Sequence, residues 1–223
     1  MMIHPDFQGA MARERSATMA AAAAAHRQAR QLRRARQLRL AATTPGVAGQ
    51  VVLRDGSAVL IRPVRSTDAP LLADGFARLS ERSRRLRFLG RKNTLTEAEL
   101  RYYADVDHHD HEALGAIDHV RGGGVGVARY VRDREDPGAA EIAITIVDDW
   151  QGRGLGTELL ARLSDRACQE GIGRFTALVS ADNAAVAGLL RSSGAGLVRR
   201  GSGTAEYQID LTCASVRDER ESA

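Results

Sequence analysis

Three glycines stand at alternate positions, Gly152, Gly154 and Gly156, between an apolar run and an amphipathic stretch. Glycine adopts backbone angles with positive φ and lets a ligand approach the main chain closely. The first N–H groups of a helix lack partners and carry the positive end of the helix dipole. These glycines therefore predict a helix start that holds a phosphate or pyrophosphate on main-chain amides, to which Arg153 would add charge.

Two common phosphate-binding motifs do not fit this stretch. A P-loop ends in Gly-Lys-Ser/Thr, whereas Gly156 is followed by Thr157. A dinucleotide fingerprint has its third glycine three positions after the second, and Thr157 occupies that position as well. The order "QGRGLG", which begins at Gln151, resembles instead the Gln/Arg-x-x-Gly-x-Gly/Ala signature of the GNAT superfamily of acyl-CoA-dependent N-acyltransferases.

The resemblance extends from about Val51 to Leu211. In that family a strand splays from its neighbour and exposes its backbone to the pantetheine arm of acetyl-CoA, and "ITI" occupies that place here. One strand and one helix after the glycines, Asn183 occupies the place of a family Asn that contacts the cofactor, eleven residues before Gly194. The resemblance implies acetyl-CoA as co-substrate and no metal. It assigns to acetyl-CoA the residues Ile144, Thr145, Ile146, Gln151, Gly152, Arg153, Gly154, Leu155, Gly156, Thr157 and Asn183.

Acetyl transfer to an amine needs a base, because a lysine amine is charged at pH 7. Glu141 opens the run "EIAITIV", and on a strand it would share one face with Ala143 and Thr145. The protein acetyltransferases that this sequence resembles use a Glu at this position as general base. The alternative interpretation is an exposed carboxylate at a strand end, without a catalytic role.

Many family members carry a Tyr seven residues after the motif Asn, as general acid for the departing thiolate. Leu190 stands there in this sequence, so no general acid is assigned. The same departure occurs in a bacterial lysine-acetylating subgroup, which "RDGSAVLIRPVRSTDAPLL", "SRRLRF" and "VDHHDHEAL" also resemble. The resemblance implies that the acceptor is a protein lysine, with acyl-CoA synthetases as typical targets.

Three other functions remain open on the sequence. One is acetylation of a small-molecule amine, because substrate-binding segments carry little pattern in this family. Another is a non-catalytic acyl-CoA-binding regulatory module, for which the missing Tyr leaves room. A nucleic-acid-binding protein that works through an arginine arm is the third, and the acidic balance of the chain after that arm argues against it.

"DVDHHDHE", from Asp105 to Glu112, contains three histidines and four carboxylates. Their spacings of one and two would rarely converge on one metal ion. The favoured interpretation is a solvated acidic turn, and the second is a substrate-facing loop that attracts a lysine-bearing protein. Trp150 is expected to pack under the glycine loop.

The elements that must position these residues alternate between strands and helices. Asp55-Gly56 predicts a hairpin between two β-rich runs, and "RGGG" predicts a turn between "EALGAID" and "VGVARYVRD". Ser66 or Thr67 is expected to cap the helix in "APLLADGFARLS". Thr94 with Glu97 is expected to form a capping box for the helix through Tyr103. Further strands are "AEIAITIV", "RFTALVS" and "AEYQIDL", and further helices follow Gly156, end near Gly90 and run through "NAAVAGLLRSSG".

This order predicts an α/β (α+β) domain rather than a bundle or a sandwich. The resemblance specifies the GNAT fold, with a mixed, mostly antiparallel central sheet, a splayed pair of strands and flanking helices. The predicted domain covers residues 49–213. It follows a basic Ala/Arg-rich arm, residues 1–48, which is helical or disordered, and precedes a charged tail, residues 214–223.

The net charge of +4 belongs to the beginning of the chain. Residues 1–50 contain eight arginines against Asp6 and Glu14, which leaves 24 basic and 26 acidic residues after them. Only Cys168 and Cys213 are present, so the sequence predicts no disulfide framework, and Cys168 is expected in the core rather than as a nucleophile. No apolar run approaches the ~20 residues of a membrane span. These observations favour a cytoplasmic enzyme without a membrane partner.

Overall fold

The computed structural model describes residues 48–213. The predicted basic arm, except for its last residue, and the predicted charged tail lie outside the described residues. Within the described part, strands and helices alternate in the order that the sequence predicts, with one additional strand.

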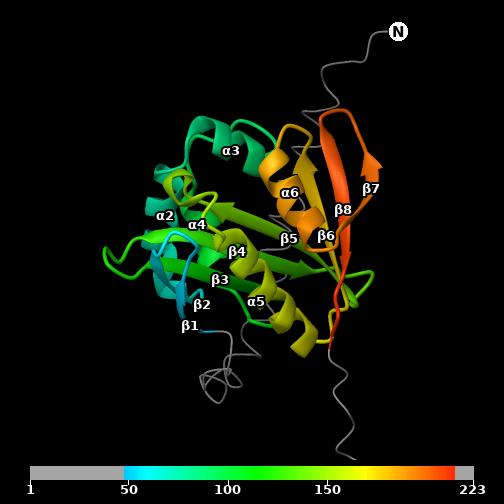
Figure 1. Cartoon of the computed structure of the whole chain (residues 1–223), viewed down its shortest axis with the longest axis horizontal. Coiled ribbons are helices and arrows are strands. Elements are labelled where there is room, and N and C mark those ends of the chain that lie inside the picture. Colours follow the sequence, from blue (N-terminus) through cyan, green and yellow to red (C-terminus); the bar gives the residue numbers. More distant parts are fainter. Residues whose placement is uncertain (1–47, 214–223) are drawn as a thin grey trace, which may run out of the picture. The chain divides into compact units, whose positions relative to one another are not determined.

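Eight strands form one sheet, in the order β1-β2-β3-β4-β5-β6-β8-β7 (Figure 1). Every neighbouring pair is antiparallel except β5 with β6, which is parallel. The mixed, mostly antiparallel sheet is therefore confirmed. The strands are β1 (Gly49–Val52), β2 (Ala58–Pro63), β3 (His111–Asp118), β4 (Gly124–Arg132), β5 (Ala139–Ile146), β6 (Arg174–Ser180), β7 (Gly196–Arg200) and β8 (Thr204–Asp210).

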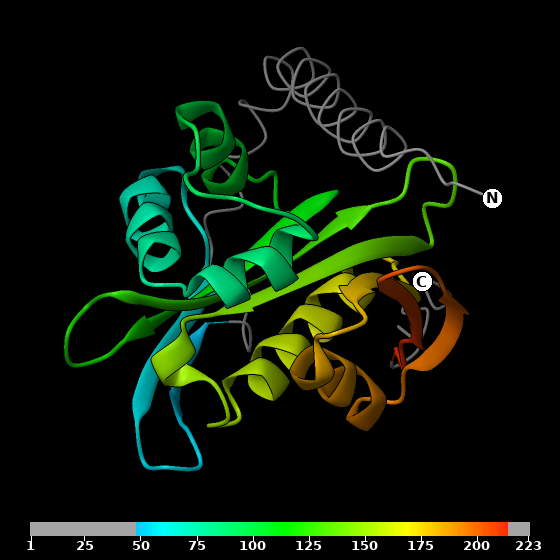
Figure 2. The same ribbon diagram turned by 90° about the horizontal axis from the view of Figure 1, so that it is seen from above.

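Helices cover both faces of the sheet. The α-helices are α2 (Ala69–Ala77), α3 (Glu81–Phe88), α4 (Glu97–Ala104), α5 (Leu155–Gln169) and α6 (Ala184–Ser192), and two short 3₁₀ helices are η1 (Ser66–Asp68) and η2 (Asp148–Trp150). Figure 2 shows α5 and α6 on one face, and α2, α3 and α4 on the other. The second face is the one that bears the candidate general base.

The main core lies between the sheet and α5. Leu155, Leu159 and Leu163 repeat every four residues, so they share one face of α5, and each is at most 1% exposed. They pack with the even-numbered side chains of β5, including Ile142 and Ile144. Burial of one leucine contributes about 2 kcal/mol. This packing fixes where the glycine loop presents the start of α5.

Both predicted hairpins are confirmed. β1 and β2 pair on either side of the Asp55-Gly56 turn, in which Gly56 has a φ of 85°. β3 and β4 pair on either side of the glycine-rich turn, where Gly122 has a φ of 73°.

Two predicted helix starts are wrong. Ser66 and Thr67 lie inside η1, and Asp68 is the residue that precedes α2. The capping box of α4 is formed by Thr96 and Glu99, two residues later than predicted. The Thr-x-x-Glu pattern occurs twice in this stretch. Leu95 precedes the helix, and its side chain lines a cavity between α2 and the sheet.

The sequence analysis missed β7. All five of its residues are exposed, because it is an edge strand that pairs only with β8 among the described residues. Its side chains therefore lack the alternation between apolar and polar that indicates a half-buried strand.

The expectation about the cysteines is also wrong. Cys168 near the end of α5 and Cys213 after β8 form a disulfide across a sequence separation of 45. Cys168 is half-buried rather than part of the core. In the described part of the chain, no helix has both the length and the apolar character needed to cross a membrane.

Candidate active site

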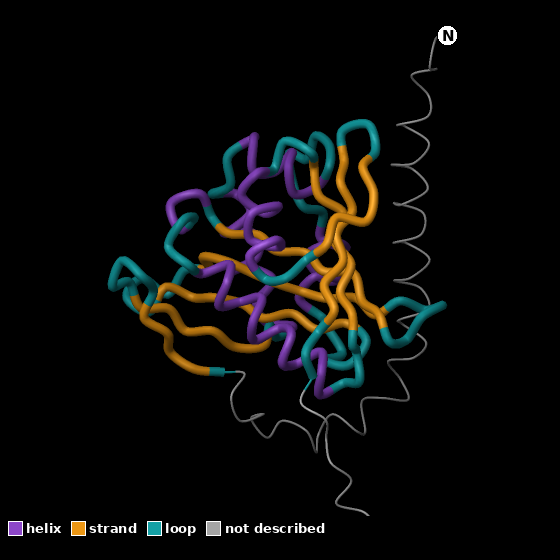
Figure 3. Tube along the Cα trace, turned by 45° about the vertical axis from the view of Figure 1, so that its right-hand side comes forward, coloured by secondary structure: helices purple, strands orange, loops and turns teal. Residues whose placement is uncertain are grey.

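The sheet opens between β5 and β6. Their parallel pairing covers only Ala139, Ala140 and Glu141, which face Arg174, Phe175 and Thr176. Within residues 48–213, β6 pairs with no residue of β5 beyond Glu141, while β5 continues to pair with β4 as far as Ile146. Figure 3 shows β6, β8 and β7 turning away from the direction of β3 to β5. The expected splayed pair of strands is thus present, and it begins at Glu141.

The three residues expected along this opening present only their backbone to it. The side chains of Ile144 and Ile146 pack against the core. The hydroxyl of Thr145 accepts a hydrogen bond of 3.1 Å from Arg87 Nε on the other face of the sheet. An extended ligand in the opening would therefore meet main-chain N–H and C=O groups, as the pantetheine arm requires.

The glycine loop joins the open end of β5 to α5. Gly152 and Gly154 have φ values of 75° and 93°, in the left-handed region that glycine tolerates. Gly154 is the N-cap of α5, and no described side chain caps this helix. The N–H groups of Leu155, Gly156 and Thr157 belong to its first turn, so they are available to an anion.

Gln151 and Arg153 brace this loop. Gln151 Nε2 donates a hydrogen bond of 3.0 Å to the carbonyl of Ile146. Arg153 Nη1 lies 2.8 Å from Asp55 Oδ2 in the β1–β2 turn, and the guanidinium stacks 4.9 Å from the centre of the Trp150 ring. Trp150 packs against the core, as expected. The charge of Arg153 is therefore directed at Asp55, and the anion site consists chiefly of main-chain amides.

Arg54 is a residue at this loop that the sequence analysis missed. Its backbone N–H donates to the carbonyl of Arg153 at 3.2 Å. A Cβ at position 154 would lie 3.3 Å from Arg54 Nε, so this exposed cation lies directly against Gly154. Arg54 and Gly154 are far apart in the sequence, so only the contact between the β1–β2 turn and the glycine loop reveals that they are neighbours.

Asn183 stands at the other side of the opening, after β6. Its Oδ1 accepts a hydrogen bond of 3.2 Å from the N–H of Val186, so the side chain caps α6. α3 contacts both β5 and β6, and Arg82 Nη2 lies 3.5 Å from the carbonyl of Asp182. α3 thus spans the opening from the α2 side.

Glu141 lies where the two strands separate, and it is exposed. Ala143 and Thr145, on the same face of β5, line the cavity beneath α2, whereas Ile142 and Ile144 pack on the opposite face. The predicted alternation is therefore confirmed. The carboxylate faces the side of the sheet from which an acceptor would approach.

Tyr102 on α4 is a second residue near Glu141 that the sequence analysis passed over. Burial raises the pKa of its hydroxyl, and the charge of Glu141 adds a smaller contribution in the same direction. Its ring lies 5.0 Å from that of His111. Leu190, where many family members have a Tyr, is 1% exposed in the core.

The segment "DVDHHDHE" is not a solvated turn, because His111 and Glu112 are each 1% exposed. Glu112 accepts from Arg166 Nε at 3.1 Å and lies 2.7 Å from His108 Nδ1. His109 pairs with Glu170, the residue that caps the C-terminal end of α5. Among residues 48–213, no cluster of three His, Cys, Asp or Glu side chains is arranged to hold a metal ion.

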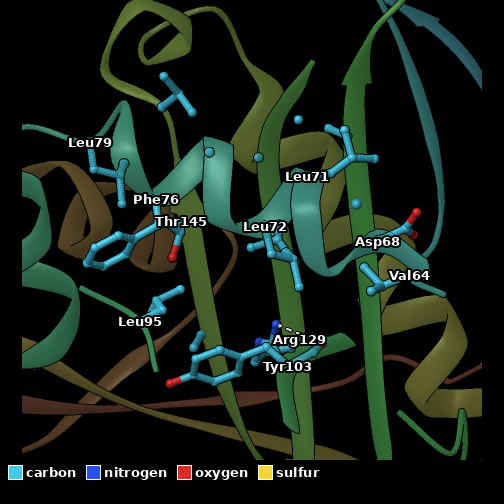
Figure 4. Close-up of a pocket in the computed structure, with 18 of the residues that line it drawn as sticks. Val64, Asp68, Leu71, Leu72, Phe76, Leu79, Leu95, Tyr103, Arg129 and Thr145 are labelled. Atoms are coloured by element: carbon cyan, nitrogen blue, oxygen red, sulfur yellow. Dashed lines mark hydrogen bonds between the residues drawn. The ribbon is translucent and has the colours of Figure 1, made fainter. Parts of the chain in front are cut away.

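A cavity lies between α2, α3, α4 and the face of the sheet that carries Glu141, with about 90 Å³ of free space. Figure 4 shows Leu72 and Phe76 above it, and Arg129, Tyr103 and Thr145 along its other walls. Apolar side chains dominate the lining. Three arginines also reach it, which are Arg62, Arg87 and Arg129.

A sheet that splays after three residue pairs, with a glycine-started helix at its open end and a carboxylate where it closes, defines an acyltransferase fold of GNAT type. The acetyltransferase (GNAT) domain family matches residues 58–196. The chain therefore belongs to the GNAT acetyltransferase family.

Two curated relatives and one solved structure are similar to this chain. Acetyltransferase Pat of Mycolicibacterium smegmatis is 34% identical over 182 residues, which are 82% of this chain and 54% of that protein. Acetyltransferase PA5475 of Pseudomonas aeruginosa is 38% identical over 136 residues, 60% of this chain and 73% of that protein. The crystal structure of the GNAT domain of S. lividans PAT is 26% identical, with a TM-score of 0.71, and the match covers 76% of this chain and 99% of that domain. The chain thus spans about half the length of its Mycolicibacterium relative.

Proposed function

We propose that this chain transfers an acetyl group from acetyl-CoA directly to an amine, and that this amine is a protein lysine side chain. The observation that carries the proposal is the separation of β5 from β6 at Glu141. This separation leaves a backbone-lined opening between the glycine-started end of α5, which no described side chain caps, and an exposed carboxylate.

Each end of the opening supports one part of the reaction. The amide groups that begin α5 would hold the pyrophosphate, with Arg54 next to them. The backbone of Ile142–Ile146 would align the pantetheine arm and polarise the thioester carbonyl. Glu141 would accept the proton of the ammonium group, so that the neutral amine attacks the carbonyl carbon.

The departing thiolate needs no dedicated acid. Thiols have pKa values near 8.5, so water protonates the CoA thiolate after the C–S bond breaks. Both cysteines of the chain are joined in the disulfide, so neither offers a thiol for a covalent acyl-enzyme. Direct transfer is the mechanism that these residues support.

The lysine acceptor rests on the resemblance to the bacterial lysine-acetylating subgroup. The test is release of CoA thiol from acetyl-CoA by the full chain, with an acyl-CoA synthetase and with a panel of small amines. We expect release with the synthetase, together with an acetylated lysine in its mass spectrum. Release with small amines alone would contradict the protein acceptor. No release with either, despite acetyl-CoA binding in calorimetry, would favour the binding-module alternative.

A further inference from the structure

A buried arginine, Arg129, and a partly buried one, Arg87, meet at one end of the cavity beneath α2. Arg129 on β4 is 6% exposed, and its guanidinium lies 4.5 Å from the centre of the Tyr103 ring. Its Nη1 lies 3.1 Å from His111 Nε2, and its Nη2 donates to the carbonyl of Tyr103 at 3.4 Å. Arg87 on α3 reaches the same end, donates to Thr145 Oγ1, and stacks 5.1 Å from the centre of the Phe88 ring.

No carboxylate neutralises this pair within residues 48–213, since no Asp or Glu oxygen there lies within 4.0 Å of either guanidinium. His111 accepts from Arg129 through Nε2, so its ring is neutral and supplies no counter-charge. Arg62, the third arginine of the cavity, differs, because its two terminal nitrogens pair with Asp68 at 2.6 and 2.9 Å.

The two unpaired cations oppose each other's charge. Burial, and then the neighbouring charge of Arg87, lowers the pKa of Arg129 to about 10. Burial also lowers the pKa of Arg87, and the more distant charge of Glu141 offsets part of that effect. Buried charges in proteins are normally paired, because an unpaired one loses its hydration without gaining a counter-charge. The arrangement is therefore that of a site completed by an anion.

The space beside the two arginines exists because the residues around Arg129 on the neighbouring strands are small. Ala113 and Ala143 lie opposite Arg129 on the neighbouring strands, and Gly115 lies opposite Val127. Ala143 is two residues from Glu141 on the same face of β5, which is about 7 Å along a strand. An anion beside Ala143 would thus lie two residues along β5 from Glu141, the proposed general base.

The two substrates would reach Glu141 from different directions. The opening for the pantetheine arm runs along the edge of β5 that faces β6. The cavity instead covers the face of β3, β4 and β5 beneath α2. A group that fills the cavity therefore belongs to the acceptor rather than to acetyl-CoA.

We infer that Arg87 and Arg129 bind a carboxylate of the acceptor, so that the acceptor is an amine with a carboxylate close to it. A guanidinium pair suits this group, because its N–H donors form paired hydrogen bonds with carboxylate oxygens. The carboxylate could belong to a free amino acid or to an acidic side chain beside a lysine. The inference rests on the proposed function for the position of the amine at Glu141.

Matched acceptor pairs test the inference by thiol release with the full chain. One pair is a free amino acid and its carboxamide, and the other is a lysine peptide with a neighbouring Glu and the same peptide with Gln. We expect the carboxylate form to be preferred at least tenfold in kcat/KM in one of the two pairs, which identifies its source. Arg87→Gln and Arg129→Gln should remove the preference, whereas Arg62→Lys, a control in the same cavity, should keep it.

A binding measurement without catalysis separates this inference from the proposed function. Glutarate should raise the Tm of the wild type, and glutaramide should not. Arg87→Met should abolish the glutarate effect, and without glutarate its Tm should equal or exceed that of the wild type, because a partly buried charge without a carboxylate partner among residues 48–213 is removed. A purely structural arginine would give a lower Tm instead.

Several results would overturn the inference. One is a carboxylate preference in kcat/KM that survives both arginine substitutions. Another is the absence of a glutarate effect on the Tm of the wild type, and a third is a glutarate effect that Arg87→Met retains. An arginine-dependent preference for succinyl-CoA over acetyl-CoA, without any acceptor preference, would assign the carboxylate to the acyl donor. If no amine releases thiol, the proposed function fails, and the glutarate measurement alone decides whether the carboxylate site exists.

Discussion

Glu141 combines two properties that a general base in this opening needs. It is exposed, so an acceptor can reach it, and it occupies the last residue pair before β5 leaves β6. The alternative, an exposed strand-end carboxylate without a role, has the same burial but makes a different kinetic prediction.

Glu141→Gln should lower kcat/KM for the acceptor by about 10²–10⁴-fold, the usual contribution of a general base. The affinity for acetyl-CoA should change little, because the proposed binding site consists of the glycine loop and the backbone of β5. Thiol-release kinetics and calorimetry measure the two quantities. Glu135→Gln, an exposed substitution in the β4–β5 connection, is the matched control. A folded Glu141→Gln protein with wild-type kcat/KM would show that Glu141 is not the base.

At the scale of elements, Gly154 is the position of the glycine loop where both the backbone angle and the available space disfavour a side chain. Gly154 has a φ of 93° and lies against Arg54, so a side chain there meets both backbone strain and crowding. Gly154→Ala should lower the free energy of unfolding by about 1–2 kcal/mol and weaken acetyl-CoA binding. Urea unfolding and calorimetry measure these effects.

Two other glycines serve as controls for that substitution. Gly171 has a φ of 76° with nothing within 4 Å of a Cβ, so Gly171→Ala should lose stability but keep acetyl-CoA affinity. Gly188 lies inside α6 with open space around it, so Gly188→Ala should gain about 0.5–1 kcal/mol. Equal acetyl-CoA affinity in the position 154 and 171 variants would contradict the anion site.

A single carboxylate fastens α3 to the loop before α5. Asp148 accepts hydrogen bonds from the Ser80 N–H at 2.9 Å and from the Ser80 and Ser83 hydroxyls at 2.8 and 2.7 Å. Burial alone would raise the pKa of Asp148, but these hydrogen bonds outweigh it and hold the pKa below its ordinary value of 3.8. The contact holds α3, and with it Arg87, across the opening.

A carboxyl group whose pKa is lowered on folding stabilises the protein above its unfolded pKa, and that contribution is lost as the pH falls through the folded value. Asp148→Asn should therefore lower the free energy of unfolding by about 1 kcal/mol at pH 7. The difference from the wild type should shrink below pH 3.8. Urea unfolding across this range tests it, with Asp149→Asn as the neighbouring exposed control. A difference that is independent of pH would point to a steric effect.

At the scale of the whole molecule, the disulfide joins the end of α5 to the end of β8. It closes a loop of 45 residues that contains β6, α6, β7 and β8, the strands on one side of the opening. The chain-entropy model gives such a loop a stabilisation of up to about 4 kcal/mol. The bond therefore holds that half of the sheet to the helix that presents the anion site.

Reduction with dithiothreitol, or Cys213→Ser, should lower the free energy of unfolding by up to about 4 kcal/mol. Thiol titration in denaturant should find no free thiol before reduction and two after it. The double variant Cys168→Ser/Cys213→Ser should not respond to the reductant. Two free thiols in the protein before reduction would contradict the bond.

The sequence by itself determined the order of the elements other than β7, both hairpins, the glycine loop that leads into α5 and the face of β5 on which Glu141 lies. These features depend on residues close along the chain, through alternation with a period of two, the helical repeat and the positive φ of glycine. The resemblance to the GNAT family rested on the same local patterns. The start of α4 was misplaced because two overlapping capping boxes are equally good locally, and packing of Leu95 decides between them.

Only the tertiary structure decided what lies next to the reacting groups. The exposed edge strand β7 has no local signal, and the disulfide depends on where two distant segments end. Arg153 turned out to pair with Asp55, while Arg54 took the place beside Gly154. The cavity with Arg87 and Arg129 is assembled from three α-helices and four strands. A charge without a partner can be recognised only when all its neighbours are in place, because burial and ion pairing are properties of contacts in space rather than of order along the chain.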